Sequence, residues 1–289
     1  MKKLNLFAIL AVSVSLAAFT TSCNSDEPDE AALTITAQDE TQVSSISDDV
    51  VSSADDVITT IEAGNYAAAP SASAAQKVPS PRNIEGVIVT YDKTGNEFPK
   101  TITLDYGTTG LTGKRGNVFK GKVIIVITGR MDVAGSMRTY TFENFTVNDN
   151  QVKGSKSVTF NGVTSGKPSW SIVVKDTVVR TDGKTVIWNA TRTRTRDNNG
   201  TPLIALDDTF SFSGTASGVN AKGVAYTIEI TKPLVMSVVW PVFVEGTTLL
   251  TSEKRTVVVD YGDGTKDLKA TATVNGVTKE FTLRGGKNL

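Results

Sequence analysis

An alternating run of arginines and threonines is the part of this sequence best suited to chemistry. Residues 191–196 read Thr-Arg-Thr-Arg-Thr-Arg. Successive side chains of a strand point to opposite faces, so Arg192, Arg194 and Arg196 share one face with Trp188, and the threonines share the other. Arginines at this spacing can bind sulfate, phosphate or carboxylate groups through paired hydrogen bonds, and Trp188 can stack on a sugar ring. The run is a candidate anionic-glycan site. The interpretation we favour is a solvated strand face whose arginines meet neighbouring acids.

A second candidate site is an acidic loop near the C-terminus. Asp260, Asp263 and Asp267 lie within eight residues of one another. Clustered carboxylate oxygens are the ligands that Ca²⁺ prefers, so these three side chains form a candidate metal site. The alternative is a hairpin loop in which aspartate and glycine supply the turn geometry.

The residue types that are missing exclude most familiar catalytic sites. The sequence contains no histidine and a single cysteine, Cys23. This excludes Ser-His-Asp and Cys-His catalysis and the usual zinc sites. Two carboxylates can cleave a glycoside without either residue, but no acid pair stands out for that role. We therefore expect no cofactor and no enzyme activity, with a carboxylate glycosidase as the least favoured alternative.

The N-terminus has the layout of a lipoprotein signal. Lys2 and Lys3 precede an apolar run over residues 4–19, and three small polar residues then lead to Cys23. The run is shorter than the roughly 20 residues of a transmembrane helix. Lipidation also explains an unpaired cysteine in a secreted protein. We expect a signal peptide over 1–22 and acyl chains such as palmitate on Cys23. Such chains would anchor the mature protein to the outer membrane, with cell-surface exposure left open.

Charge and composition divide the mature chain. Residues 24–76 carry eleven acids and no lysine or arginine, whereas residues 77–289 carry a net charge of +9. We expect an acidic tether over 23–40, an amphipathic helix over 41–64 and an Ala/Ser/Pro-rich linker over 65–82. The helix is predicted from an apolar stripe at spacings of mostly three and four residues. The stripe consists of Val43, Ile46, Val50, Ala54, Val57, Ile58 and Ile61.

This helix has many serine, threonine and β-branched residues, so it is a weak helix on its own. It needs a surface against which to pack its stripe. We expect that surface to be its own β-domain, and the alternative is a partner protein.

Residues 83–289 read as strand after strand, with no helical period beyond a few residues. Asn275-Gly276 is a strong hairpin signal, and Asn161-Gly162, Asp182-Gly183 and Asp263-Gly264 indicate further turns. Short connections favour antiparallel pairing. The sequence therefore predicts an all-β domain, either an antiparallel β-sandwich or a curled β-meander. The clearest strands cover 101–106, 122–128, 138–147, 170–174, 185–195, 209–215, 224–231, 255–261, 270–274 and 277–283.

One short pattern occurs twice. Residues 101–107 and 256–262 each form a β-rich stretch that ends in Asp-Tyr-Gly. The two stretches could come from a duplicated half, or they could share one way to end a strand. The pattern is too short to establish a repeat.

Several segments together resemble a group of uncharacterised Bacteroidota outer-membrane lipoproteins. The likeness implies an anchored, β-rich envelope protein and brings no assigned activity. It is carried by Asp105-Tyr106-Gly107, Lys120-Gly121-Lys122, Thr128-Gly129-Arg130, Phe142 to Asn150, Trp188 to Arg194, Tyr226 to Thr231 and Asp260-Tyr261-Gly262.

Taken together, these features predict a membrane-anchored, non-catalytic binding or structural module for an anionic glycan or envelope polymer. A nucleic acid partner is not expected for an exported, anchored protein. Two further alternatives remain: a carrier of lipids or lipoproteins with an apolar concave sheet, and a fimbrial or adhesion subunit.

Overall fold

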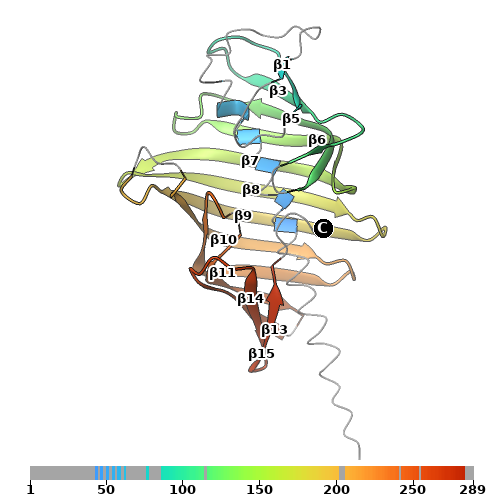
Figure 1. The fold of residues 1–289 in the computed structure, drawn as a ribbon, viewed down its shortest axis with the longest axis vertical. Helices are drawn as coiled ribbons and strands as arrows, with labels where there is room; N and C mark the ends of the chain where they lie inside the picture. Colours follow the sequence, from blue (N-terminus) through green and yellow to red (C-terminus); the bar gives the residue numbers. More distant parts are fainter. Residues whose placement is uncertain are drawn as a thin grey trace, which may run out of the picture.

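The computed structural model shows one large antiparallel sheet, in which nearly every strand pairs with the next strand of the chain (Figure 1). The structure describes helical residues between 43 and 62, residues 76–77, and residues 86–283 except 114–115, 202–205, 241 and 254. The predicted all-β antiparallel fold is confirmed, and it takes the form of the curled meander rather than the sandwich.

Fifteen strands follow one another along the sheet in chain order, except that β4 pairs beside β5 and lies off the main path. Within the described part of the chain no pairing joins β15 to β1 or β2, so the sheet is open. The strands are β1 (Gln76–Lys77), β2 (Ile88–Tyr91), β3 (Lys100–Asp105), β4 (Leu111–Thr112), β5 (Val118–Ile127), β6 (Met137–Val147), β7 (Asn150–Thr164), β8 (Lys167–Val179), β9 (Thr185–Asp197), β10 (Thr209–Val219), β11 (Ala225–Ser237), β12 (Glu245–Ser252), β13 (Arg255–Asp263), β14 (Lys269–Val274) and β15 (Val277–Thr282).

Two of the predicted turns show what a glycine contributes to this sheet. Asn275 and Gly276 join β14 to β15 with φ values of 50° and 82°, the left-handed geometry of a two-residue hairpin. The turn predicted at Asn161-Gly162 is wrong. Gly162 lies inside β7, at a register shift against β8 that follows Phe160, and pairing continues on both sides of it. There the glycine forms a bulge, because its φ of 96° suits an extra residue in the ladder.

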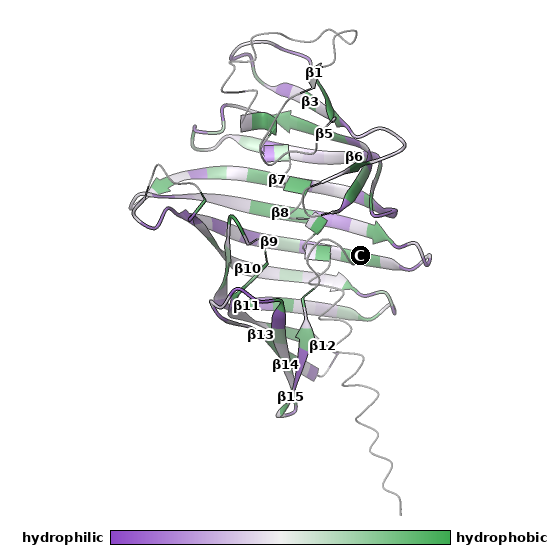
Figure 2. Ribbon diagram, viewed as in Figure 1, coloured by the Kyte–Doolittle hydropathy of each residue, from purple (hydrophilic) through white to green (hydrophobic). Residues whose placement is uncertain are grey.

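The inner face of the sheet holds the core, and the helix lies across it (Figures 1 and 2). The described residues of the predicted stripe are all buried, which confirms that the helix docks on its own β-domain. Ile61 lies outside the described residues. The buried stripe residues are Val43, Ile46, Val50, Ala54, Val57 and Ile58.

Three hydrogen bonds fix the path of the helix over the strands. Arg192 Nη1 in β9 donates to Ser44 Oγ over 2.8 Å, and Lys156 Nζ in β7 donates to the Ser47 carbonyl over 2.9 Å. At the other end, the Met131 N–H donates to Glu62 Oε1 over 3.1 Å. The helix therefore runs from β9 to the loop between β5 and β6.

The two Asp-Tyr-Gly segments adopt the same local structure. In each, the tyrosine is buried and the aspartate Oδ1 accepts a hydrogen bond from the glycine N–H, over 2.8 Å in Asp105–Gly107 and 2.9 Å in Asp260–Gly262. Each segment also pairs with a strand that carries a glycine at a register shift, Gly121 in β5 and Gly246 in β12. However, β5 follows its Asp-Tyr-Gly strand in the chain, whereas β12 precedes it. A duplicated unit would keep one order, so the geometry favours a shared way to end a strand.

Candidate functional site

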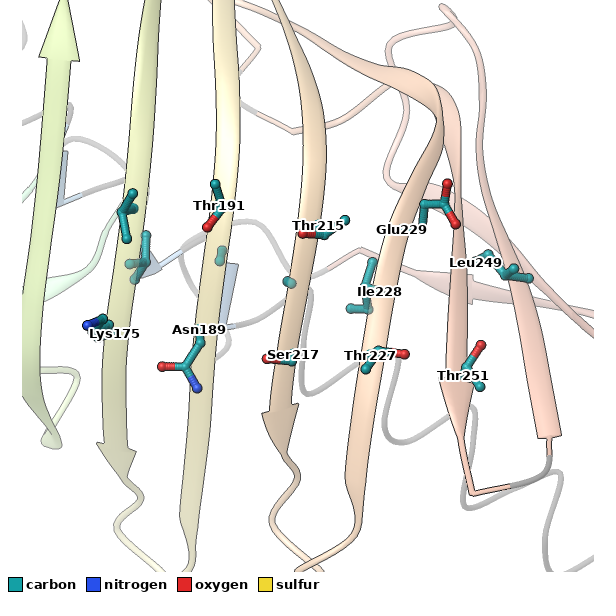
Figure 3. A pocket seen from close by; sticks show the side chains of 14 residues that line it. Lys175, Asn189, Thr191, Thr215, Ser217, Thr227, Ile228, Glu229, Leu249 and Thr251 are labelled. Carbon is teal, nitrogen blue, oxygen red and sulfur yellow. The ribbon is translucent and has the colours of Figure 1, made fainter.

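The face of the sheet turned away from the helix carries an open groove of about 550 Å³ across β8 to β12 (Figure 3). Fourteen residues line it, and ten of these alternate with the buried positions of their strands, so their side chains lie on the outer face. These ten are Val173, Lys175, Asn189, Thr191, Thr215, Ser217, Thr227, Glu229, Leu249 and Thr251.

The ten side chains form two rows that run straight across five strands. In the polar row each residue is the direct cross-strand partner of the next: Lys175, Asn189, Ser217, Thr227, Thr251. The mixed row, one step along the strands, is Val173, Thr191, Thr215, Glu229, Leu249. Neighbouring strands lie about 4.8 Å apart, so each row is roughly 19 Å long. Both rows are visible in Figure 3.

Bulges in β11, against β10 on one side and β12 on the other, accompany the hollow in the outer face. The pairing of β10 with β11 shifts between Phe212 and Thr215, and the pairing of β11 with β12 shifts after Ile230. A bulge bends its strand and increases the local twist. Gly214 of β10 lies opposite the first of these bulges: its φ is 127°, and a Cβ atom there would lie 2.2 Å from the Thr191 carbonyl oxygen.

The groove lining is mostly polar and uncharged. Serine, threonine and asparagine side chains both donate and accept hydrogen bonds, and the only charged side chains in the lining are Lys175 and Glu229. The lining therefore offers one carboxylate, whereas glycoside cleavage by paired acids needs two. It contains no aromatic side chain, and the half-buried Trp170 and Trp240 lie elsewhere. Such a surface suits a ligand rich in hydroxyl groups.

The predicted arginine site lies on the opposite, inner face, beneath the helix. Trp188 has no exposed surface, and the Arg192 guanidinium lies 4.9 Å from the centre of the Trp188 ring. Arg192 is itself buried and hydrogen-bonds to Ser44. Neither face of the indole is open to a sugar, so the structure brings these two predicted residues together as packing partners.

Arg194 and Arg196 are also tied to residues of the chain. Arg194 lies between the Trp170 and Phe210 rings, 4.6 Å and 5.1 Å from their centres. Its Nη2 atom is 3.6 Å from Asp55 Oδ2 of the helix. Arg196 is about one-third exposed and forms an ion pair with the buried Asp208.

Asp55 is the centre of the polar contacts under the helix. It accepts hydrogen bonds from Arg138 and from the Tyr140 hydroxyl, the latter over 2.7 Å. Arg138 and Tyr140 are buried, and burial together with the nearby Asp55 charge raises the pKa of Tyr140 well above its usual value. A carboxylate therefore compensates a cation that the sheet has removed from water.

The sequence contained a signal for this inward orientation. Val186, Trp188 and Ala190 occupy the same face of β9 as the arginines, and apolar residues at alternate positions mark the core side of a strand. The threonines Thr191, Thr193 and Thr195 form the outward row, and Thr191 of this row lines the groove. Its significance was missed because threonines carry no charge.

The three aspartates of the candidate metal site each cap their own turn. Asp260 Oδ1 accepts from Gly262, Asp263 Oδ1 from Thr265, and Asp267 Oδ1 from Lys269. Hydrogen bonds from the Thr265 hydroxyl and N–H lower the pKa of Asp263. Among the described residues, no group of three His, Cys, Asp or Glu side chains is placed to hold a metal ion.

Cys23 lies outside the described residues, as does the rest of the predicted signal peptide and tether. No helix in the described part of the chain is long and apolar enough to cross a bilayer. Comparison of the chain with protein-family models, curated proteins and solved structures finds no match.

Proposed function

We propose that this protein is a membrane-anchored, non-catalytic binding module of the bacterial envelope, and that the outer-face groove binds a glycan or a similar polyhydroxylated polymer. The observation that supports the proposal is the pair of cross-strand rows, which places hydroxyl and amide groups at regular intervals along an open trough. A polymer lying across the strands would meet a new polar side chain at every strand. Hydrogen bonds between such groups and sugar hydroxyls replace those that both partners make with water.

The placement of the arginines changes the class of glycan we favour. Arg192 and Arg194 contact the helix and the core, so the outer groove has one cation, Lys175, and one anion, Glu229. We therefore favour an uncharged or weakly charged polymer over a strongly anionic one. Val173 and Leu249, at the two ends of the mixed row, offer apolar contact to the less polar faces of the sugar rings.

Two other functions from the sequence receive weaker support. A lipid carrier would use the apolar inner face, which the helix covers from β9 to the β5–β6 loop. A fimbrial subunit would offer an edge strand for pairing, and β15 is such an edge. However, charged residues such as Lys279 and Glu280 on an edge strand oppose pairing with another chain.

Affinity electrophoresis through gels that contain neutral or anionic polysaccharides tests the proposal. Asn189→Ala combined with Thr227→Ala removes the two polar groups that flank Ser217 in the polar row. At about 1 kcal/mol for each hydrogen bond, we expect a loss of affinity of roughly tenfold or more for the polymer that the native chain binds best.

The matched control carries the same number of changes on the same face of distant strands. Thr103→Val in β3 and Thr139→Val in β6 lie outside the groove and should leave binding unchanged. Equal loss in the two double variants would contradict the proposed site. Unchanged binding by the groove variant would do so as well.

A further inference from the structure

The two ends of the sheet differ in the composition of their loops. In an antiparallel meander alternate loops emerge at the same end of the sheet. The end toward which the β7 arrow points in Figure 1 is called the apolar end from here on. Its loops from β5 onward cover residues 128–136, 165–166, 198–208, 238–244 and 264–268. The opposite end is made of the short connections 148–149, 180–184, 220–224, 253–254 and 275–276.

The apolar end presents a row of exposed aliphatic and thioether side chains. Four of them lie in its loops, and two lie at the adjoining strand ends. Among the described residues, the opposite connections contain no large apolar side chain that is exposed, and two such side chains, Ile88 and Val277, lie at the adjoining strand ends. The six residues and their exposed fractions are Val133 53%, Met137 37%, Val163 62%, Leu206 62%, Val239 53% and Leu268 38%.

The β11–β12 loop is the most apolar of these connections. Residues 238–244 read Val-Val-Trp-Pro-Val-Phe-Val, with no polar side chain. Phe243 packs inward, with its ring centre 5.6 Å from that of Phe212 and 5.5 Å from that of Tyr261. This contact fixes the side of the loop that leads into β12, while Val239 on the β11 side is exposed.

The charges at this end are of both signs. The loop 238–244 has none, and in the β5–β6 loop the Arg130 Nε atom lies 3.1 Å from Asp132 Oδ1. The loops 198–208 and 264–268 carry Asp207, Asp208, Lys266 and Asp267. Because Arg130 pairs with Asp132 and Asp208 pairs with Arg196, we base the inference below on burial of apolar side chains rather than on a strong field of one sign.

We infer that the apolar end rests on a lipid bilayer and that its loop tips insert into the interfacial region. Loops at one end of the sheet are separated by two strands, or about 10 Å, so their tips form a spaced row rather than a packed patch. A protein interface needs a close-packed centre, whereas a fluid lipid surface accepts each tip separately.

The expected anchor supports this choice of partner. Nineteen residues lie between Cys23 and Val43, and at about 3.5 Å per residue the segment reaches at most roughly 70 Å. A bilayer therefore lies within reach of the domain wherever the tether emerges. The inference concerns which end of the domain faces the lipid, and it holds for any ligand of the outer groove.

The single cysteine permits a direct test in the full chain. In a Cys23→Ser background, in which we expect the apolar segment 4–19 to attach the chain to vesicles, one new cysteine carries an environment-sensitive dye. The positions are Val133→Cys and Val239→Cys at the apolar end and Thr181→Cys at the opposite end. The vesicles are zwitterionic and carry lipids with a quencher on the acyl chain.

Insertion to about 5–10 Å should place the dyes at 133 and 239 near the quencher and leave the dye at 181 in water. We expect a blue shift and at least a twofold stronger quenching at the apolar end, and both should persist at high salt. Equal signals at the three positions would overturn the inference. So would water-like spectra at 133 and 239, which would point instead to a protein partner for these loops.

A charge variant adds a second measurement. Val133→Asp with Val239→Asp should shift the dye at a third apolar-end position, Leu206→Cys, back toward its spectrum in water. The matched control, Thr108→Asp with Thr181→Asp at the opposite end, should leave that dye unchanged. Loss of the signal in the control as well would show that added negative charge, and not the lost apolar tips, moves the domain away from lipid.

Discussion

The inner and outer faces of β9 carry different chemistry on adjacent residues. On the inner face, Arg192 and Arg194 contact the helix and two tryptophans. On the outer face, Thr191 and Thr193 are exposed and uncharged. The charged row is therefore built into the core, and the surface open to ligands is the neutral one. The segment 24–76 contains acidic residues and no lysine or arginine, and the helix belongs to this segment. A row of arginines on the sheet can therefore bind the helix.

The inner face should be the more sensitive of the two to substitution, and Asp55→Ala should have the largest effect. The change leaves buried Arg138 and Tyr140 without their carboxylate partner. Breaking a buried ion pair costs about 3–5 kcal/mol, which chemical denaturation would measure as a lower free energy of unfolding.

Two further variants serve as controls for the change in free energy of unfolding. Asp149→Ala removes a carboxylate that is 66% exposed and paired with Lys120, and it should cost less than about 1 kcal/mol. Asp55→Asn keeps an acceptor and should fall between the two. If Asp55→Ala is as mild as Asp149→Ala, the contacts under the helix do not stabilise the fold.

Gly214→Ala should lower both the stability of the fold and the affinity of the outer groove. The added methyl group meets the Thr191 carbonyl at a φ that only glycine adopts readily, so we expect a loss of about 1–3 kcal/mol. Displacement of the β10 backbone between Phe212 and Thr215 should also weaken polymer binding in the groove. Gly183→Ala is the matched control, because its φ is also positive but no atom lies within 4 Å of the added Cβ. Gly183→Ala should leave binding intact.

Changes on the outer face should affect binding and leave stability nearly unchanged. Thr191→Val keeps the shape of an exposed side chain and removes its hydroxyl, so the free energy of unfolding should move by less than about 0.5 kcal/mol. Affinity for the groove polymer should fall several-fold. A large change in stability would show that the threonine row is part of the framework.

Glu62 should give the smallest effect, visible as a dependence on pH. Burial raises the pKa of this carboxyl group, although the Met131 N–H and Arg130 partly oppose the rise. A carboxyl group whose pKa is higher in the folded state stabilises the fold at a pH below its unfolded pKa of about 4.3. This stabilisation is lost as the pH rises through the folded pKa. Glu62→Gln keeps an acceptor for Met131 and does not titrate. Its melting temperature should exceed that of the native chain by an amount that grows from pH 4 to 7. An equal difference at both pH values would contradict this origin.

Much of the fold could be predicted from the sequence because its interactions are local. Strand alternation, the Asn275-Gly276 hairpin and the apolar stripe of the helix each depend on neighbouring residues, and the structure confirms them. Asn161-Gly162 could not be resolved as a bulge, because the same dipeptide serves a turn or a bulge according to what the partner strand does.

The candidate site was harder to predict because it depends on distant residues. Which face of β9 is open depends on the helix, whose Ser44 lies 148 residues from Arg192. The rows of the groove combine five strands whose register no single segment reveals. The arginines were chosen as the candidate site because they are charged. However, Val186, Trp188 and Ala190 lie at alternate positions on the same face of the strand, and these apolar residues already indicated that this face is the inner one.

The order of strands also has a consequence for how the protein forms. Each long strand pairs with its chain neighbour, so the sheet can grow strand by strand with short loop closures. The helix is the exception, because its bonds to Arg138, Lys156 and Arg192 close loops of 83, 109 and 148 residues. It is synthesised before the strands that cover its apolar stripe, and as a weak helix it gains most of its stability only when β9 is in place. Docking of the helix therefore indicates that the strands up to β9 are in place.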